Sequence, residues 1–167
     1  PAAWLVALPL LALPLILYRP LETRFNAFWL ARSCSFLVSR SLGKVEGIEA
    51  RCEAFAARIA DAVAREENDE VLVIGHSVGT HLAITVVARA IDRMAAGGRI
   101  RLLTLGQSIA MTPAEPAAEQ FRIDLLAVAT SPKVTWLDVT SAIDGSCIPL
   151  TDPLATSGVP RPHGAEI

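Results

Sequence analysis

The chain has 167 residues, which is the size of one ordinary folded domain. Apolar residues make up 52% of it and charged residues 19%, and this composition excludes disordered and low-complexity classes. The formal net charge of −2 provides no electrostatic attraction to nucleic acid, so no nucleic-acid partner is expected. The apolar excess instead indicates contact with a membrane.

The excess is greatest near the start of the chain. The run from Ala2 to Tyr18 holds no charged residue and reaches the lower limit of about 17 residues for a helix that spans a bilayer. It is therefore a transmembrane candidate, although Pro9 and Pro14 interrupt it, and a signal-peptide core or a buried hairpin are the alternatives. Five basic residues follow and, by the positive-inside rule, place the downstream domain in the cytoplasm: Arg19, Arg24, Arg32, Arg40 and Lys44.

Two helices are expected next. The stretch from Phe25 to Val38 mixes aromatic residues with arginines, as a helix at a membrane interface does. Between Glu46 and Arg65, apolar residues recur every three or four positions and charged residues fill the other face. We therefore expect residues 1–44 to form an apolar, membrane-associated segment with an interfacial helix, and residues 45–167 to form the folded domain.

Strands and helices alternate in that second part. Strands are predicted at Val71–Ile74, Ile100–Leu105 and Val134–Val139, with helices at Thr80–Ala96 and Ala117–Ala129. The first strand is a continuous apolar run, typical of a strand buried on both faces of a sheet. This alternation predicts an α/β fold, a parallel sheet with flanking helices.

The cysteines and histidines indicate no bound metal or other cofactor. Cys34, Cys52 and Cys147 are odd in number and widely spaced, which fits neither a disulfide framework nor a zinc motif. The three histidines show no metal-ligand spacing relative to them. We expect reduced thiols and no metal.

The most informative motif is the pentapeptide from Gly75 to Gly79, Gly-His-Ser-Val-Gly, at a predicted strand-to-helix junction. A serine in such a turn is lifted above the carboxyl end of the strand, and both glycines are expected to avoid collisions with the strand and helix. Ser77 is thus the candidate nucleophile. The backbone N–H of Val78, at the positive end of the following helix, is the candidate oxyanion donor. The alternative is a tight turn in which the serine only caps the helix.

On this motif the chain resembles the α/β-hydrolase superfamily, specifically lipase-like or esterase-like members with a Gly-His-Ser-x-Gly elbow. The resemblance covers Glu46 to about Leu150. It implies a catalytic acid after the second strand beyond the elbow. Asp144 lies in the loop past that strand and is the preferred acid, while Asp138 lies within the strand and is the alternative.

The resemblance also implies a histidine base later in the chain. His76 lies inside the elbow and His81 on the following helix, so His163 has the right order. Its interval from Asp144 leaves little room for the usual last helix and strand, and no early glycine-rich loop supplies a second oxyanion donor. The chain is therefore expected to be an internal fragment of a partial α/β-hydrolase domain, with its base beyond Ile167 and low activity in isolation.

These features predict a membrane-associated serine hydrolase that acts on a carboxylic or lipid ester through an acyl-enzyme on Ser77. One alternative is a patatin-like acyl hydrolase with a Ser and Asp dyad, since Asp144-Gly145-Ser146 loosely fits its motif. Another is an inactive hydrolase fold that serves as an interaction module. The oligomeric state does not follow from the sequence.

Overall fold

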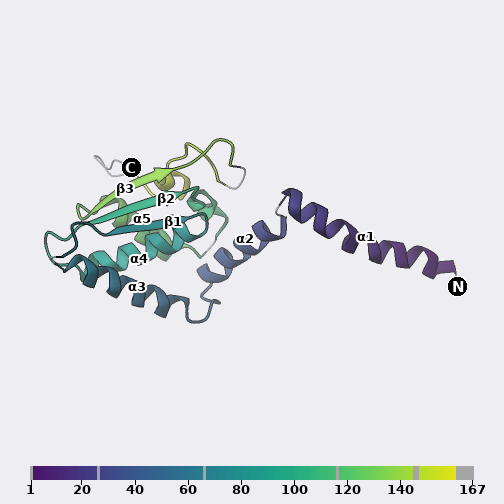
Figure 1. Cartoon of the computed structure of the whole chain (residues 1–167), viewed down its shortest axis with the longest axis horizontal. Helices are drawn as coiled ribbons and strands as arrows, with labels where there is room; N and C mark the ends of the chain where they lie inside the picture. Colours follow the sequence, from purple (N-terminus) through teal and green to yellow (C-terminus); the bar gives the residue numbers. More distant parts are fainter. Residues whose placement is uncertain (1, 26, 66, 116, 145–146, 161–167) are drawn as a thin grey trace. The chain divides into compact units, whose positions relative to one another are not determined.

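The computed structural model describes the chain except for residues 1, 26, 66, 116, 145–146 and 161–167. Two compact units can be distinguished, residues 1–36 and residues 37–167 (Figure 1). The predicted division after residue 44 lies further along the chain. The observed division comes earlier because Leu37 is buried and Arg40 donates a hydrogen bond to Thr85 at 2.9 Å.

The first unit is helical, as the apolar run predicted. Helix α1 covers Ala2–Phe25, and helix α2 covers Ala27–Ser41 and continues into the second unit. The carboxylate of Glu22 accepts hydrogen bonds from the backbone N–H groups of Phe28 at 2.7 Å and Trp29 at 3.1 Å, which satisfies donors at the start of α2. Among the described residues, no helix combines the length and apolar character needed to cross a bilayer.

The second unit contains a three-stranded parallel sheet in the order β1-β2-β3. The strands are β1 (Leu72–His76), β2 (Ile100–Leu105) and β3 (Val134–Val139). The predicted α/β class is confirmed, and the second and third strands have the predicted bounds. Strand β1 starts one residue later than predicted and continues through Gly75 and His76, so it runs directly into the turn at Ser77.

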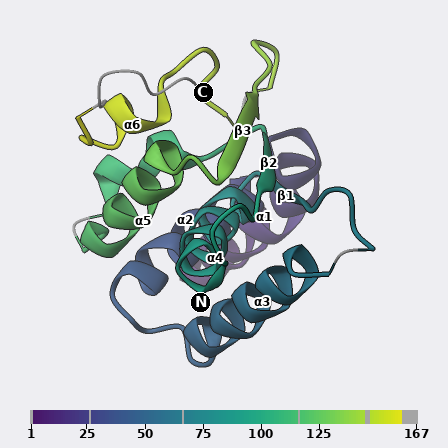
Figure 2. The ribbon, with the colours of Figure 1, turned by 90° about the vertical axis from the view of Figure 1, so that its left-hand side faces the viewer.

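Helices cover one face of this sheet. They are α3 (Ile48–Val63), α4 (Gly79–Arg93) and α5 (Glu119–Thr130), close to the predicted ranges. Helix α4 packs against β1 and β2 and lies between α3 and α5 (Figure 2). Its buried side chains meet those of the strands in one core that includes Ile84, Val87, Ile100, Leu102 and Leu125. Helix α4 is therefore the element that fixes the elbow against the sheet.

The other face of the sheet is exposed within the described part of the chain. Side chains alternate along a strand, and every second residue of β1 and β3 points away from the helices. Leu72, Ile74 and Leu137 on that face are 52%, 57% and 60% exposed. The prediction that the first strand is buried on both faces is therefore wrong for the described structure, because all the helices packed on the sheet lie on one side.

The connections after β2 and β3 include two short helical pieces. The predicted loop after β2 contains a 3₁₀ helix, η1 (Ile109–Ala114). The turn-rich end of the chain contains α6 (Pro153–Thr156), which packs against η1 and begins where Asp152 accepts a hydrogen bond from the N–H of Leu154 at 2.9 Å. Of the two, η1 directly follows the loop Gly106–Ser108 at the carboxyl edge of the sheet.

Candidate active site

Ser77 occupies a sharp left-handed turn between β1 and α4. Its φ of 53° is a conformation that costs an L-residue roughly 1–2 kcal/mol. Hydrogen bonds hold it there: its N–H donates to the carbonyl of Leu105 at 3.0 Å, and its carbonyl accepts from the N–H of Thr80 at 3.0 Å and from the Thr80 hydroxyl at 2.6 Å. The turn is thus fixed both to the neighbouring strand and to the first turn of the helix.

The two glycines of the motif differ in their surroundings. A Cβ added at Gly75 would lie 2.9 Å from the Cβ of Ala83 and 3.0 Å from the Cα of Thr80. The expected collision is therefore confirmed at Gly75, where β1 and α4 approach each other. A Cβ at Gly79 would meet no atom within 4 Å, so the same expectation is wrong there. Gly79 is the first residue of α4, and its added side chain would face open space.

Val78, the residue after Ser77, lies at the N-terminus of α4. Val78 has a φ of −57° and precedes the first residue of α4. Backbone N–H groups at the start of a helix have no acceptor within that helix and carry the positive end of its dipole. The N–H of Val78 therefore lies at the start of the helix that follows Ser77, as the sequence predicted.

Asp144 lies at the same edge of the sheet. A Cβ added at Gly106 would come within 3.0 Å of its Oδ2 atom, so the carboxylate lies directly against the residue that follows β2. Since β1 and β2 are in register with His76 opposite Leu105, Ser77 and Gly106 are neighbours just past the paired strand ends. Ser77 and Asp144 thus both border Gly106.

Asp138 has a different environment. Its Oδ1 accepts a hydrogen bond from the Thr104 hydroxyl at 2.5 Å, and Thr104 in turn accepts from the indole N–H of Trp136 at 2.8 Å. Burial raises the pKa of Asp138, and the hydrogen bond from Thr104 acts in the opposite direction. This cross-strand network between β2 and β3 gives Asp138 a structural role inside the sheet.

The three histidines are placed very differently. His76 is exposed at the end of β1, and His163 lies outside the described residues. His81 is buried in α4: its ring stacks on Phe121 with centroids 4.4 Å apart, and its Nε2 lies 3.1 Å from the carbonyl of Ser108. Burial lowers the pKa of His81 to about 4, so the ring is neutral at neutral pH. It is engaged in the core and not in the turn.

The loop after β2 carries two residues that the sequence reasoning missed. The Ser108 hydroxyl donates to the carbonyl of Ser77 at 3.3 Å, and Gln107 is fully buried with its Oε1 accepting from the N–H of Ile109 at 2.6 Å. Their position in the sequence could have identified them. Gly106-Gln107-Ser108 directly follows a predicted parallel strand, and the carboxyl ends of parallel strands meet at one edge of a sheet, so these residues are expected near Ser77.

In the described part of the chain, no group of three His, Cys, Asp or Glu side chains is arranged to hold a metal ion. Cys34, Cys52 and Cys147 are free thiols. Comparisons of the chain with protein-family models, with curated proteins and with solved structures found no match.

Proposed function

We propose that the protein is a serine hydrolase in which Ser77 attacks a carboxylic ester and forms an acyl-enzyme that water resolves. The observation that carries this proposal is the left-handed conformation of Ser77 at a strand-to-helix turn. Strained backbone of this kind persists only where the surroundings enforce it, and it is concentrated at functional sites. The packing of Gly75 against α4 and the hydrogen bonds on Ser77 enforce it here.

The supporting roles are assigned from position. The N–H of Val78 would stabilise the oxyanion, and Asp144 would orient the histidine base and stabilise its charged form. Asp144 is preferred over Asp138 because it borders Gly106 beside Ser77, whereas Asp138 is engaged with Thr104. The proposed acid follows the second strand after the elbow, the position that the resemblance to α/β-hydrolases implies for it. His163 has the chain position of the base.

The test is covalent labelling of the full chain by a fluorophosphonate probe, which reacts with activated serines. Labelling is expected in the wild type and in Ser108→Ala, and it is expected to disappear in Ser77→Ala. Ser108 is the matched control because its hydroxyl lies next to the turn and donates a hydrogen bond to the carbonyl of Ser77 at 3.3 Å. Equal labelling of wild type and Ser77→Ala would rule out Ser77 as the nucleophile.

The choice of acid is tested by a matched pair of substitutions in the same enzyme. Asp144→Asn is expected to slow labelling at least tenfold with little change in the free energy of unfolding. Asp138→Asn is expected to lower that free energy, because Thr104 loses its charged acceptor, and to leave the labelling rate of the folded protein largely unchanged. The reverse pattern would assign the acid to Asp138.

Lipid-like esters at a membrane are the proposed substrates. Helix α1 supports this, since its Leu8, Leu10 and Ile16 are more than 60% exposed. By the positive-inside rule, the basic residues after the apolar run favour a cytoplasmic catalytic unit.

One observation favours the alternative functions. Of the two histidines that the structure describes, His81 is held by Ser108 and His76 is exposed, and neither has a hydrogen bond to Ser77 among the described contacts. A patatin-like Ser and Asp dyad, or an inactive interaction module, would need no histidine. Labelling that survives His163→Ala and His76→Ala but requires Asp144 would indicate the dyad. Absence of labelling in every form would indicate the inactive module.

A further inference from the structure

His81 and Glu115 form a buried pair of titratable side chains that have no part in the proposed chemistry at Ser77. They are 1% and 5% exposed, and Nδ1 of His81 lies 4.0 Å from Oε1 of Glu115. His81 belongs to α4, and Glu115 follows η1, where its N–H donates to the carbonyl of Thr112 at 2.9 Å. The pair thus joins the helix that begins after Ser77 to the connection that follows β2.

The contacts of His81 fix where its ring carries a proton. The carbonyl oxygen of Ser108, 3.1 Å from Nε2, can only accept a hydrogen bond, so Nε2 holds the proton that is donated to it. Burial lowers the pKa of His81 to about 4, and a neutral ring holds one proton only. Nδ1 is therefore an acceptor without a proton, and the atom that faces it is Oε1 of Glu115.

An ionised Glu115 would not suit this position. Its carboxylate oxygens are acceptors only, so Oε1 and Nδ1 of His81 would face each other with no proton between them. Oε1 is buried and has no hydrogen-bond partner among the described residues. A buried polar group in this state is costly, because it loses its hydration without compensation.

The charged groups around Glu115 do not compensate its charge. In the described part of the chain, no lysine or arginine forms an ion pair with it. Burial raises the pKa of Glu115 and has the largest effect, while the charges of Arg40 and Arg122 lower it. Arg40 is paired with Glu49 at 3.5 Å, and Nε of Arg122 donates to the carbonyl of Ser157 at 2.8 Å. Both arginines are thus engaged elsewhere.

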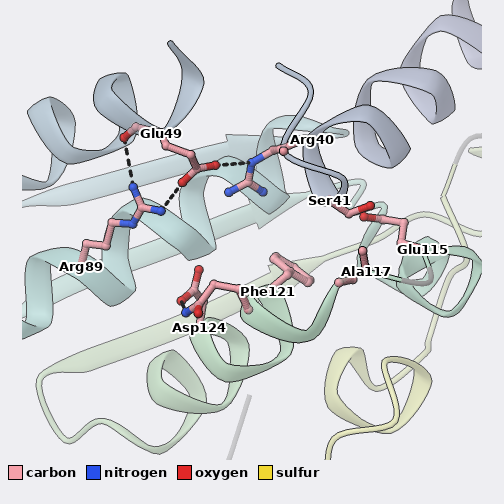
Figure 3. A pocket seen from close by; sticks show the side chains of 11 residues that line it. Arg40, Ser41, Glu49, Arg89, Glu115, Ala117, Phe121 and Asp124 are labelled. Atoms are coloured by element: carbon pink, nitrogen blue, oxygen red, sulfur yellow. Dashed lines mark hydrogen bonds and ion pairs between the residues drawn. The ribbon is translucent and has the colours of Figure 1, made fainter. Parts of the chain in front are cut away.

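A cavity of about 210 Å³ gives the Glu115 side chain room to turn. The cavity lies between the end of α2, helices α3 and α4 and the start of α5, with Glu115 at one end and Asp124 at the other (Figure 3). The 4.0 Å between Oε1 and Nδ1 of His81 is longer than a hydrogen bond. Small changes in the side-chain torsions of Glu115 are sufficient to close it, because the terminal torsion of a glutamate has broad energy wells.

We infer that Glu115 holds a proton at neutral pH and donates it in a hydrogen bond to Nδ1 of His81, as a positioning residue for the turn at Ser77. A carboxylic acid has one O–H donor, so this proton satisfies both buried acceptors at once. Both side chains are then neutral, which is the form that burial favours for a carboxyl group and for an imidazole. The positioning role rests on the proposed function of Ser77, whereas the protonation of Glu115 does not.

The effect reaches Ser77 through the backbone of a loop. The hydrogen bond made by one nitrogen of a neutral histidine ring decides which nitrogen carries the proton, so a donor on Nδ1 keeps the proton on Nε2. Nε2–H then holds the carbonyl of Ser108, in the loop Gly106–Ser108 between β2 and η1. This loop borders Ser77 and Asp144. Without the donor from Glu115, the ring is free to take the other tautomer and release the loop.

Carbon-13 NMR of the full chain, labelled at the side-chain carboxyl carbon of glutamate, tests the protonation. The signal that disappears in Glu115→Gln belongs to Glu115. At pH 7 this signal is expected at the position of a protonated carboxylic acid, whereas the signal of Glu119, an exposed residue of α5, is expected at that of an ionised carboxylate. An ionised Glu115 at pH 7 would overturn the inference.

Two substitutions at Glu115 separate a hydrogen-bond donor from a side chain that only fills space. Glutamine keeps an N–H donor for Nδ1, and methionine has a similar length but no donor. Nitrogen-15 NMR of His81, with its signals assigned by their loss in His81→Gln, is expected to show a hydrogen-bonded Nδ1 in the wild type and in Glu115→Gln. In Glu115→Met, Nδ1 is expected to be free.

Labelling of Ser77 by the fluorophosphonate probe tests the positioning. The labelling rate is expected to stay within about twofold of wild type in Glu115→Gln and to fall at least fivefold in Glu115→Met. Glu119→Met is the matched control at an exposed site and should change neither the rate nor the His81 signals. Near-ultraviolet circular dichroism checks that each variant is folded.

The outcomes separate this inference from the proposed function. The carboxyl signal of the wild type decides the protonation even where Glu115→Met does not fold. Equal Nδ1 signals in folded Glu115→Gln and Glu115→Met would contradict the hydrogen bond, and equal labelling rates in the two would contradict the positioning role. Absence of labelling in the wild type would contradict the nucleophile and not the buried proton, which the NMR signals establish separately.

Discussion

Gly75 lies where β1 and the first turns of α4 come closest, and its missing side chain permits that contact. A methyl group there would lie 2.9 Å from Ala83 and 3.0 Å from the backbone of Thr80. Because the second of these atoms is backbone, the contact cannot be relieved by a rotamer change. The close approach packs the end of β1, next to the left-handed Ser77, against α4.

Gly75→Ala is therefore expected to lower the free energy of unfolding by about 1–3 kcal/mol, the usual cost of overpacking. Gly79→Ala is the matched control, because open space surrounds that position and alanine favours a helix over glycine. It should be neutral or slightly stabilising. Urea unfolding measures both, and equal losses in the two variants would show that the contact at Gly75 does not set the turn.

His81 gives the protein a pH-dependent stability. Burial lowers the pKa of His81 from 6.5 to about 4, so the folded state favours the neutral ring. Between those two values the unfolded chain binds a proton that the folded chain does not. The contribution of the neutral His81 ring to the free energy of unfolding should thus be fully present above about pH 6.5. It should be lost as the pH decreases toward 4, which lowers the free energy of unfolding by on the order of 3 kcal/mol.

His81→Gln, which keeps a donor for the Ser108 carbonyl, should flatten this part of the stability profile, while His76→Gln at an exposed site should not. Burial raises the pKa of the neighbouring carboxyl groups Glu115 and Asp124, so their contribution to stability increases as the pH falls, opposite to that of His81. The positive charge of Arg40 lowers the pKa of all three groups. Subtracting the free energy of unfolding of His81→Gln from that of the wild type at each pH isolates the contribution of the histidine. If this difference in free energy stayed constant from pH 7 to pH 4, a neutral buried ring would be contradicted.

At the scale of elements, the sheet has two unequal faces. Helices α4 and α5 pack on the face that holds Ile100 and Leu102, and α3 packs against α4, whereas Ile74 and Leu137 on the other face are more than half exposed. Parallel sheets are usually covered on both faces. The apolar residues of the outer face therefore add little to the stability of the second unit as described.

Leu102→Ala is expected to cost about 2–5 kcal/mol, because it leaves a cavity in the core. Leu137→Ala on the neighbouring strand is expected to cost less than about 1 kcal/mol, since its side chain is 60% exposed. Urea denaturation of the two variants provides the comparison. A large loss in Leu137→Ala would show that the outer face is covered in the protein.

At the scale of the whole molecule, the chain divides at residue 36, within α2. The core cluster starts at Cys52, and Leu37 and Arg40 connect the end of α2 to the second unit. None of the residues described for the apolar helix α1 belongs to that core. Its proposed role is membrane association.

A chain of residues 37–167 is therefore expected to unfold at the same urea concentration as the full chain. Residues 45–167 should be less stable by about 1–3 kcal/mol, because buried Leu37 and the bond from Arg40 to Thr85 are lost. In flotation with phospholipid vesicles, the full chain should bind and residues 37–167 should not. Equal flotation of the two would place the membrane contact outside the first unit.

The sequence by itself determined the α/β class, the strand and helix order and the position of Ser77. Each of these depends on local physics: hydrophobic periodicity distinguishes helix from strand, and the glycine-flanked serine marks a turn between them. The bounds of β2 and β3 followed because turn-forming residues flank compact apolar runs.

Only the tertiary structure decided which glycine of the elbow is required, which face of the sheet is covered, and that Asp144 borders Gly106 while Asp138 binds Thr104. It alone revealed Ser108 beside Ser77. These facts depend on contacts between residues far apart in the chain. Periodicity and local motifs carry no information about such contacts, because burial and pairing are set by the packing of whole elements.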